Sequence, residues 1–503
     1  MSLKRNFSVG FINSIWGALL SLAVVPFYLK YLGTEAYGLI GFYASIQALL
    51  QLLDLGLSPT INREIARCSA SGNMSEGRNL LHTLSIVYWV MACVVALVIF
   101  SLSPLISKYW LNSSNFSEDT VKYSVMLMGL VVACRWPVGL YMGALMGLQK
   151  VALSSTVGAL IGTLSSLGAI AVLAFVSPTI QAFFIWQAFV GLVYVIIMRW
   201  LMWKLIGEKN HISRFDFGDL KRIWKFSAGM SGITVTGVIM IQMNKVILSK
   251  MLSLGDFGRY VLAGVLANGL YILLTPLFNA IYPRMTALVA SGETNKLIDL
   301  YKVGTRSFLA IFFPIAITCA LFSKELLYLW TRNLQVASSS ALIASLLILG
   351  TTLNGVMHFP FAIQLAYGST RLPLKINMIL LSIMVPMTII LTVNFGAVGG
   401  AGSWALLNVI YLFVGTWMTH CSLLKGIGIQ WLFGDVMLPL AISIMTGGIG
   451  KWVFSCAFPL YTKLLVGIIL IIITFVLIIL VSHRLKEVLR ILWSTRDFWI
   501  KAH

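Results

Sequence analysis

The sequence predicts an all-α integral membrane protein with about fourteen transmembrane helices, and three observations support this fold class. Only 10% of the 503 residues are charged and 59% are hydrophobic, whereas soluble domains carry about a quarter charged residues. About fourteen segments are apolar over the roughly 20 residues that a hydrocarbon core of about 30 Å requires. The two halves of the chain also repeat each other, which predicts two lobes of six helices and two further helices at the C-terminus.

The predicted spans follow one another along almost the whole chain. They lie at residues 8–29, 37–61, 81–106, 121–146, 151–176, 179–204, 224–249, 257–283, 304–330, 340–366, 372–395, 400–424, 431–457 and 462–483. Lys4 and Arg5 precede the first apolar run as they would in a signal peptide. No small-residue cleavage site follows at the right distance, so we expect a retained first helix.

The 36 Lys and Arg residues produce a net charge of +20, and their distribution predicts an orientation. With the N-terminus inside the cell, most of these residues fall at cytoplasmic helix ends and loops, as the positive-inside rule requires. We therefore expect both termini in the cytoplasm and no nucleic-acid partner. The six cysteines are scattered, without a CxxC pair or paired histidines, so we expect no metal site, disulfide or cofactor.

An internal repeat with an offset of about 220 residues predicts the domain organisation. YLKYLGTEAYG (28–38) matches LSKMLSLGDFG (248–258), and further loop matches follow at the same spacing. Because each repeat has an even number of helices, the lobes should be related by an axis along the membrane normal, with a cavity between them. The predicted parts are an N-lobe (1–204), a cytoplasmic amphipathic linker (205–223), a C-lobe (224–425), two extra helices (426–483) and a basic amphipathic cytoplasmic tail (484–503).

Three stretches carry a resemblance to a known family. They are PFYLKYLGTEAYGLIGFYASIQALLQLLDLGLSPTINREIA (26–66), NKVILSKMLSLGDFGRYVLAGVLANGL (244–270) and IYPRMTALVASGETNKLIDLY (281–301). These stretches are similar to the O-antigen (Wzx-type) flippases of the multidrug/oligosaccharidyl-lipid/polysaccharide exporter superfamily. The resemblance implies a MATE-like fold and a transporter of the bacterial inner membrane, not an enzyme.

The resemblance also implies a cargo and a mechanism. The cargo is an undecaprenyl-diphosphate-linked oligosaccharide, the O-antigen repeat unit, which moves from the cytoplasmic to the periplasmic leaflet. Transport would proceed by alternating access, driven by an ion gradient or the membrane potential. A polysaccharide polymerase and a chain-length regulator are the protein partners that this interpretation suggests.

Two other functions stay open. A small-molecule or multidrug antiporter of the same superfamily would more typically offer acidic cavity residues to cations, whereas Arg135 and Lys245 favour an anionic cargo. A membrane-embedded O-antigen polymerase or glycosyltransferase would need catalytic carboxylates or arginines on a sizeable periplasmic loop. The longest predicted outer loop (107–120) is short.

Ionisable residues inside the spans are the candidate functional residues, because each costs from about 3 kcal/mol upward in the hydrocarbon layer. Arg135 either faces the cavity, where its guanidinium can hold a diphosphate by two parallel hydrogen bonds, or pairs with Asp54 to join two helices. Asp54, followed by Gly56 and Pro59, is either a structural or gating residue or a proton-coupling site. His358 is a second coupling candidate because histidine titrates near neutral pH; its alternative role is packing.

The remaining candidates are polar or aromatic residues expected to line the cavity. Gln242, Asn244 and Lys245 lie together in the span 224–249, although Lys245 could instead extend to the membrane interface. Asn13 and Gln364 complete the predicted substrate-binding set. Aromatic residues could stack on sugar rings, and Trp16, Trp136, Tyr141 and Tyr271 are the candidates. Asp435 is expected to cap the start of the thirteenth helix.

Overall fold

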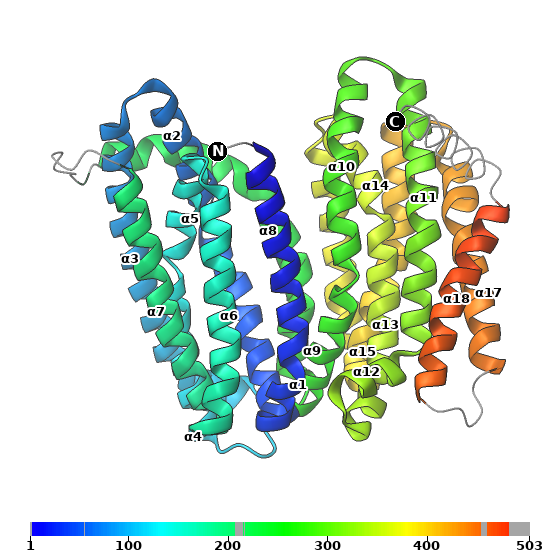
Figure 1. Ribbon diagram of the computed structural model, residues 1–503, viewed down its shortest axis with the longest axis horizontal. Coiled ribbons are helices and arrows are strands. Elements are labelled where there is room, and N and C mark those ends of the chain that lie inside the picture. Colours follow the sequence, from blue (N-terminus) through cyan, green and yellow to red (C-terminus); the bar gives the residue numbers. More distant parts are fainter. Residues whose placement is uncertain (1–2, 55, 207–214, 216, 454–459, 482–503) are drawn as a thin grey trace, which may run out of the picture. The chain divides into compact units, whose positions relative to one another are not determined.

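The computed structural model describes the chain except for residues 1–2, 55, 207–214, 216, 454–459 and 482–503 (Figure 1). The chain forms two compact units, Met1–Val261 and Leu262–His503. In the described residues both units consist of helices, which confirms the predicted all-α class. Ten of the described helical segments are long and apolar enough to cross a membrane. The exact number of fourteen crossings stays a prediction.

The first unit contains the N-terminal helices. Its elements are α1 (Leu3–Leu50), η1 (Gln51–Asp54), α2 (Leu57–Ser71), α3 (Met74–Leu105), η2 (Ile106–Trp110), α4 (Glu118–Arg135), α5 (Val138–Gly147), α6 (Val151–Phe175), α7 (Ile180–Leu205), α8 (Phe217–Met251) and the first part of α9 (Leu254–Asn268). The grouping of α8 with the preceding helices differs from the predicted lobes, which assign 224–249 to the C-lobe. The lobe boundaries remain a prediction.

The second unit contains the later helices. Its elements are the remainder of α9, then α10 (Tyr271–Ala290), α11 (Thr294–Leu321), α12 (Ser323–Thr331), α13 (Leu334–Val356), α14 (His358–Ala366), α15 (Arg371–Ser422), α16 (Gly428–Gln430), η3 (Trp431–Met437), α17 (Leu438–Val453) and α18 (Leu460–Val481). The predicted tail (484–503) and much of the predicted linker (205–223) lie outside the described residues.

Two very long helices are each a pair of helices joined at a glycine. Gly33 interrupts α1 with φ 80°, and Gly396 interrupts α15 with φ 57°. Residues with a Cβ rarely adopt this positive-φ conformation, so glycine is the residue that permits the break. Each break falls between two predicted spans, 8–29 and 37–61 in α1, and 372–395 and 400–424 in α15. The apolar pattern therefore located both interruptions.

The predicted span 37–61 is wrong as a single helix. The helix α1 ends at Leu50, η1 follows, and Gly56 with φ 76° separates it from α2. Residues 57–61, the inner end of the predicted span, belong to α2, which begins at Leu57. Because positive φ at Gly56 cannot continue a right-handed helix, the chain must change direction just beyond Asp54.

Close packing of α5 on α2 depends on three glycines spaced four residues apart. A Cβ at Gly143 would lie 2.5 Å from the Ser58 carbonyl oxygen, and one at Gly147 would lie 2.5 Å from that of Asn62. Gly139 accepts a hydrogen bond of 2.6 Å from the Ser58 hydroxyl. Such small-residue faces let helix backbones approach closely in membranes. The pair α2–α5 is therefore a tightly packed wall of the unit.

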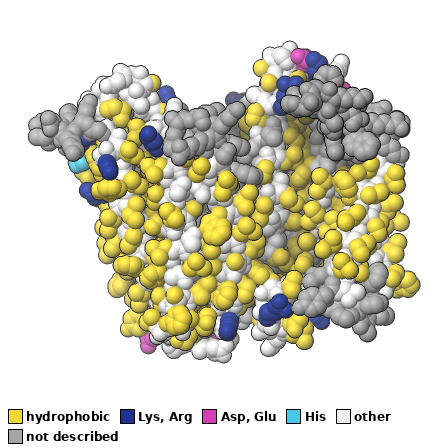
Figure 2. Space-filling view, viewed as in Figure 1, with side chains coloured by type: hydrophobic (Ala, Val, Ile, Leu, Met, Phe, Trp, Pro, Cys, Tyr) yellow, Lys and Arg dark blue, Asp and Glu magenta, His cyan; other side chains and the backbone are white. Residues whose placement is uncertain are grey.

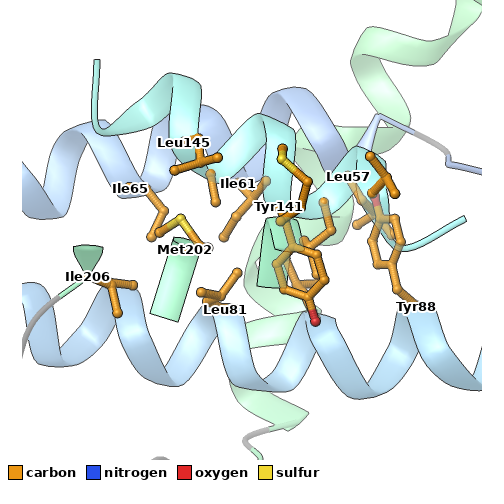
Figure 3. Close-up of a cluster of buried hydrophobic side chains, with 14 of the residues drawn as sticks. Leu57, Ile61, Ile65, Leu81, Tyr88, Tyr141, Leu145, Met202 and Ile206 are labelled. Carbon is orange, nitrogen blue, oxygen red and sulfur yellow. The ribbon is translucent and has the colours of Figure 1, made fainter. Parts of the chain in front are cut away.

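A cluster of buried apolar side chains supports this wall (Figure 3). Figure 3 shows side chains of α2 and α5 facing those of α3, with Met202 from the end of α7 beside them. The labelled members are Leu57, Ile61, Ile65, Leu81, Tyr88, Tyr141, Leu145, Met202 and Ile206. Lipid tails are as apolar as these side chains, so in a membrane the cluster is stabilised by close van der Waals packing rather than by removal from water. The cluster fixes the helices that carry the site described below.

The loop after η2 is joined to the start of α9. Leu254 donates its backbone N–H to the Asn112 carbonyl oxygen at 2.8 Å. Glu35 of α1, a buried carboxylate, accepts the backbone N–H groups of Ser114 at 2.7 Å and Asn115 at 3.1 Å. The loop that follows η2 is thus held from both sides at the predicted periplasmic end.

The surface composition agrees with a membrane protein. On the face shown in Figure 2, hydrophobic side chains cover the middle of the helices in each unit, while Lys and Arg lie toward the helix ends. Large apolar side chains such as Phe175, Ile196 and Leu97 are mostly exposed. Exposure of this extent suits contact with lipid rather than water.

Candidate functional site

A pocket of about 390 Å³ lies within the first unit, a size within the range of about 300–1,000 Å³ for small-ligand sites. Helices α1, α2, α3, α4, α5 and α8 contribute to it, together with η1. Its lining residues within the described part of the chain are Gln47, Gln51, Leu52, Asp54, Gly56, Ser58, Pro59, Tyr88, Val132, Arg135, Trp136, Gly139, Val235 and Val238. The pocket therefore brings together Arg135 and Asp54, two residues that the sequence singled out.

Asp54 is held at the break between α1 and α2. One carboxylate oxygen accepts the backbone N–H of Ser58 at 3.2 Å, and the other accepts the hydroxyl of Tyr88 from α3. An acid is favourable at this position because the first turn of α2 has unpaired N–H groups and a positive dipole end. The carboxylate thus links α2 to α3, which agrees with a structural or gating role; its role in proton coupling stays a prediction.

Arg135 ends α4, and three neighbouring groups orient its side chain. Its guanidinium donates to the side-chain oxygen of Gln187 in α7 at 2.6 Å and to the hydroxyl of Ser165 in α6 at 3.2 Å. Gly191, one turn after Gln187, gives the arginine stem room, because a Cβ there would lie 3.1 Å from Cγ of Arg135. The guanidinium is thus held in place by neutral partners.

The predicted alternative of an ion pair between Arg135 and Asp54 is wrong in this structure. Within the described residues, no carboxylate lies within ion-pair distance of Arg135, and its Nε–H is buried without a hydrogen-bond partner. Asp54 meets its own donors in α2 and α3, so the arginine keeps an uncompensated positive charge. A charge of this kind attracts an anion, since Coulomb attraction strengthens where water is reduced.

The predicted residues of α8 do not join this pocket. Val235 and Val238 represent α8 in the lining, whereas Gln242, Asn244 and Lys245 lie further along the helix. Asn244 is 2% exposed, and neither polar atom of its amide has a partner among the described residues. Lys245 is partly buried. Their role in substrate binding stays a prediction.

Three other predicted residues have partners within their own units. Asn13 of α1 donates to the Thr156 hydroxyl of α6 at 3.4 Å. Gln364 is 1% exposed and donates to the Thr419 hydroxyl at 2.7 Å, which joins α14 to α15. His358 contacts the Asn354 carbonyl oxygen at 3.2 Å through Nδ1. These contacts favour packing, although a transport role for the three residues is not tested by them.

The aromatic candidates separate into pocket and core residues. Trp136 lines the pocket, and its buried indole N–H has no partner among the described residues. Tyr141 is fully buried, with its hydroxyl 2.7 Å from that of Ser85. Trp16 donates to the Thr163 hydroxyl at 2.9 Å, and Tyr271 to the Asn354 side chain at 2.9 Å. Trp136 is therefore the aromatic candidate in the pocket.

Several pocket residues were not predicted from the sequence, and two of them are glutamines. Gln47 and Gln51 stand one helical turn apart in an apolar stretch, and Asp54 follows at the next turn. Residues at this spacing share one helix face. A search for polar residues at helical spacing, not only for charged ones, would have found both glutamines.

Asp435 does not cap a helix as the sequence predicted. It lies in η3, inside the helical run Gly428–Val453, and forms a buried ion pair with Arg306 of α11. Arg306 also donates to the Gly434 carbonyl oxygen at 3.4 Å. The acid therefore anchors this segment to α11 in the second unit.

Known proteins resemble this chain in sequence over most of its length. The model of the family described as "Polysaccharide biosynthesis protein" matches residues 3–289. A "Putative O-antigen transporter" of Shigella flexneri is 21% identical over 421 residues, which cover 81% of this chain and 96% of the relative.

Solved structures share the fold at low sequence identity. "Lipid II flippase MurJ, inward closed conformation" aligns with a TM-score of 0.66 and 14% identity, covering 93% of this chain and 98% of that one. An inward-facing multidrug resistance MATE transporter of the MOP superfamily has a TM-score of 0.60 and 12% identity, over 80% and 95% of the chains. A mutant of the Vibrio cholerae MATE transporter VcmN has a TM-score of 0.57 and 15% identity, over 85% and 98% of the chains.

Proposed function

Because the chain belongs to the polysaccharide biosynthesis protein family, we propose that this multi-pass membrane protein is a flippase for a lipid-linked oligosaccharide. Its cargo is the undecaprenyl-diphosphate-linked O-antigen repeat unit, which it moves from the cytoplasmic to the periplasmic leaflet of the inner membrane. The observation that supports this proposal most directly is Arg135, a pocket arginine without a carboxylate partner among the described residues.

The diphosphate of the cargo is the group that Arg135 would hold. Guanidinium and phosphate oxygens form parallel, charge-assisted hydrogen bonds, which are stronger than bonds between neutral groups. Gln187 and Ser165 accept hydrogen bonds from the guanidinium without neutralising it. The neutral partners therefore orient Arg135 while leaving its charge available to the anion.

The break after Asp54 is a candidate point of movement during alternating access. Gly56 allows the change of direction between η1 and α2, and Asp54 connects the break to α3 through Tyr88. Movement of α2 would carry one side of the pocket with it. The energy source in this proposal is an ion gradient or the membrane potential, and a polymerase and a chain-length regulator are the proposed partners.

A small-molecule antiporter is the second candidate, and Asp54 is the observation that favours it. A pocket carboxylate could bind a cationic drug or exchange a proton. Both carboxylate oxygens of Asp54 have donors within the protein, whereas the Nε–H of Arg135 has no partner among the described residues, and this difference favours the anionic cargo.

Complementation of a strain that lacks this gene tests the proposed function. Arg135→Ala should abolish surface polysaccharide and cause lipid-linked repeat units to accumulate in the cytoplasmic leaflet, while the level of membrane protein stays normal. Arg199→Ala, a change at an exposed arginine of α7 outside the pocket, is the matched control and should retain export. Wild-type surface polysaccharide in the Arg135→Ala strain would refute the proposal.

A further inference from the structure

One side of the pocket carries a row of side-chain amides whose role the diphosphate site does not explain. Gln47 and Gln51 line the pocket one turn apart, followed by Asp54. Gln51 is exposed and Gln47 is partly buried. Neither amide forms a hydrogen bond with another described residue, whereas Asp54 is occupied by two donors. The two glutamines therefore present polar groups to the pocket that are available to a ligand.

Gln47 is the more buried of the two amides, and a polar group removed from water costs free energy unless it finds a hydrogen-bond partner. Each glutamine carries two N–H donors and a carbonyl acceptor, so the pair offers both donors and acceptors within one helical turn. A ligand with several neighbouring hydroxyl or acetamido groups matches this arrangement.

Trp136 supplies the complementary apolar surface. It follows Arg135 directly at the break between α4 and α5 and lines the same pocket. Its indole presents a wide apolar ring, and because its N–H is buried, the ring is the part of the side chain that it offers to a ligand. Sugar rings have an apolar C–H face and a rim of hydroxyls, so an aromatic ring with nearby amides fits their chemistry.

We propose that Gln47, Gln51 and Trp136 form a subsite for the sugar that is attached to the diphosphate. The inference rests on the proposed function, because Arg135 must hold the diphosphate for the attached sugar to reach this subsite. The pocket volume of about 390 Å³ suits a small ligand rather than a long glycan. The subsite thus selects the cargo by its first sugar, while the more distant sugars lie outside it.

Binding of two short probes to the purified full-length protein tests this subsite. One probe is farnesyl diphosphate, and the other is farnesyl diphosphate that carries a single N-acetylglucosamine. Gln47→Ala and Gln51→Ala should each weaken binding of the sugar-bearing probe about 3- to 10-fold, the effect of one lost hydrogen bond. Binding of farnesyl diphosphate itself should not change.

Matched variants distinguish a specific loss of sugar recognition from a general loss of folded protein. Gln181→Ala removes an amide of α7 that is not part of the pocket lining, and it should leave both affinities unchanged. Trp136→Phe keeps an aromatic ring and should weaken the sugar-bearing probe less than Trp136→Ala does. Size-exclusion profiles and melting temperatures identify variants with folding defects, and Gln47→Met provides a second change that removes the amide without shortening the side chain or adding a charge.

The binding experiment distinguishes failure of the proposed sugar subsite from failure of the proposed flippase function. Arg135→Ala should weaken both probes, and failure to weaken farnesyl diphosphate would contradict the diphosphate site. If Arg135→Ala acts as expected, but the glutamine variants weaken both probes equally or neither probe, the sugar subsite is refuted and the flippase proposal stands.

Discussion

Arg135 of α4 and Arg306 of α11 both lie in apolar helical segments, one in each unit, and both are partly buried. Arg306 forms an ion pair with Asp435, whereas Arg135 contacts the neutral groups of Gln187 and Ser165. The comparison shows two uses of the same residue type. Arg306 is neutralised and joins two segments of the chain, while Arg135 keeps its charge at the edge of a pocket.

The physical cost of a buried charge explains why this difference matters. An ionised group taken out of water must be paired or hydrogen-bonded. The Arg306–Asp435 pair satisfies this requirement inside the protein, so removal of one partner should reduce stability. Arg135 satisfies it only in part, so its full compensation awaits a ligand anion, and its removal should reduce function more than stability.

The largest expected effect on stability follows from removal of Arg306. Arg306→Ala leaves Asp435 buried without its counter-charge and should lower the free energy of unfolding by about 3–5 kcal/mol. Thermal unfolding in detergent would measure the loss as a lower melting temperature than that of Arg135→Ala.

A double variant checks the cause of that loss. Arg306→Met combined with Asp435→Leu removes both charges and should recover much of the stability, because apolar replacement of a buried pair is often close to neutral. A wild-type melting temperature for Arg306→Ala alone would contradict a structural role of the pair.

The comparison can be reversed by giving Arg135 an acidic partner. Ser165→Asp places a carboxylate at the position of a hydroxyl that lies 3.2 Å from the guanidinium. The resulting pair should resemble Arg306–Asp435 and compete with the cargo, so that export falls about tenfold or more, equivalent to roughly 1.4 kcal/mol of lost binding. Ser165→Asn is the uncharged control; equal export by both variants would show that the free charge of Arg135 is not required.

A substitution of Asp54, the other charged residue of the pocket, is expected to have a smaller effect. Asp54→Asn keeps one acceptor oxygen for the two donors from Ser58 and Tyr88, so it should cost about 1 kcal/mol of stability and leave export active at every pH. Tyr88→Phe is the control that removes only the hydroxyl donor. If export by the wild type changes with pH and export by Asp54→Asn does not, Asp54 is instead a proton-coupling carboxylate.

The smallest expected effect concerns Arg67, an exposed arginine at the end of α2. Hydrogen bonds to Glu76 at 2.5 Å and Glu64 at 2.9 Å raise the pKa of Arg67. Water and salt screen such exposed pairs, so Glu76→Gln should change the free energy of unfolding by only about 0–1 kcal/mol. A loss as large as that of Arg306→Ala would contradict the distinction between exposed and buried pairs.

The sequence alone determined the all-α membrane class and the family, and the family match over residues 3–289 confirms the resemblance. The length and apolarity of a helix are local properties, and so is the conformational freedom of glycine. The apolar pattern was therefore sufficient to locate the helical segments and the breaks at Gly33 and Gly396. Charges are rare within the apolar segments, and this rarity by itself singled out Arg135 and Asp54.

Only the tertiary structure decided which of these groups meet. Residues 135, 165 and 187 come from three different helices. Arg306 pairs directly with Asp435, which lies more than a hundred residues further along the chain. No local pattern specifies such partners, because they depend on how α4, α6 and α7, or α11 and η3, pack. The same packing places Gln47 and Gln51 in a pocket with Trp136. The sequence analysis did not single out these two glutamines, and their place in the pocket makes them candidates for ligand binding.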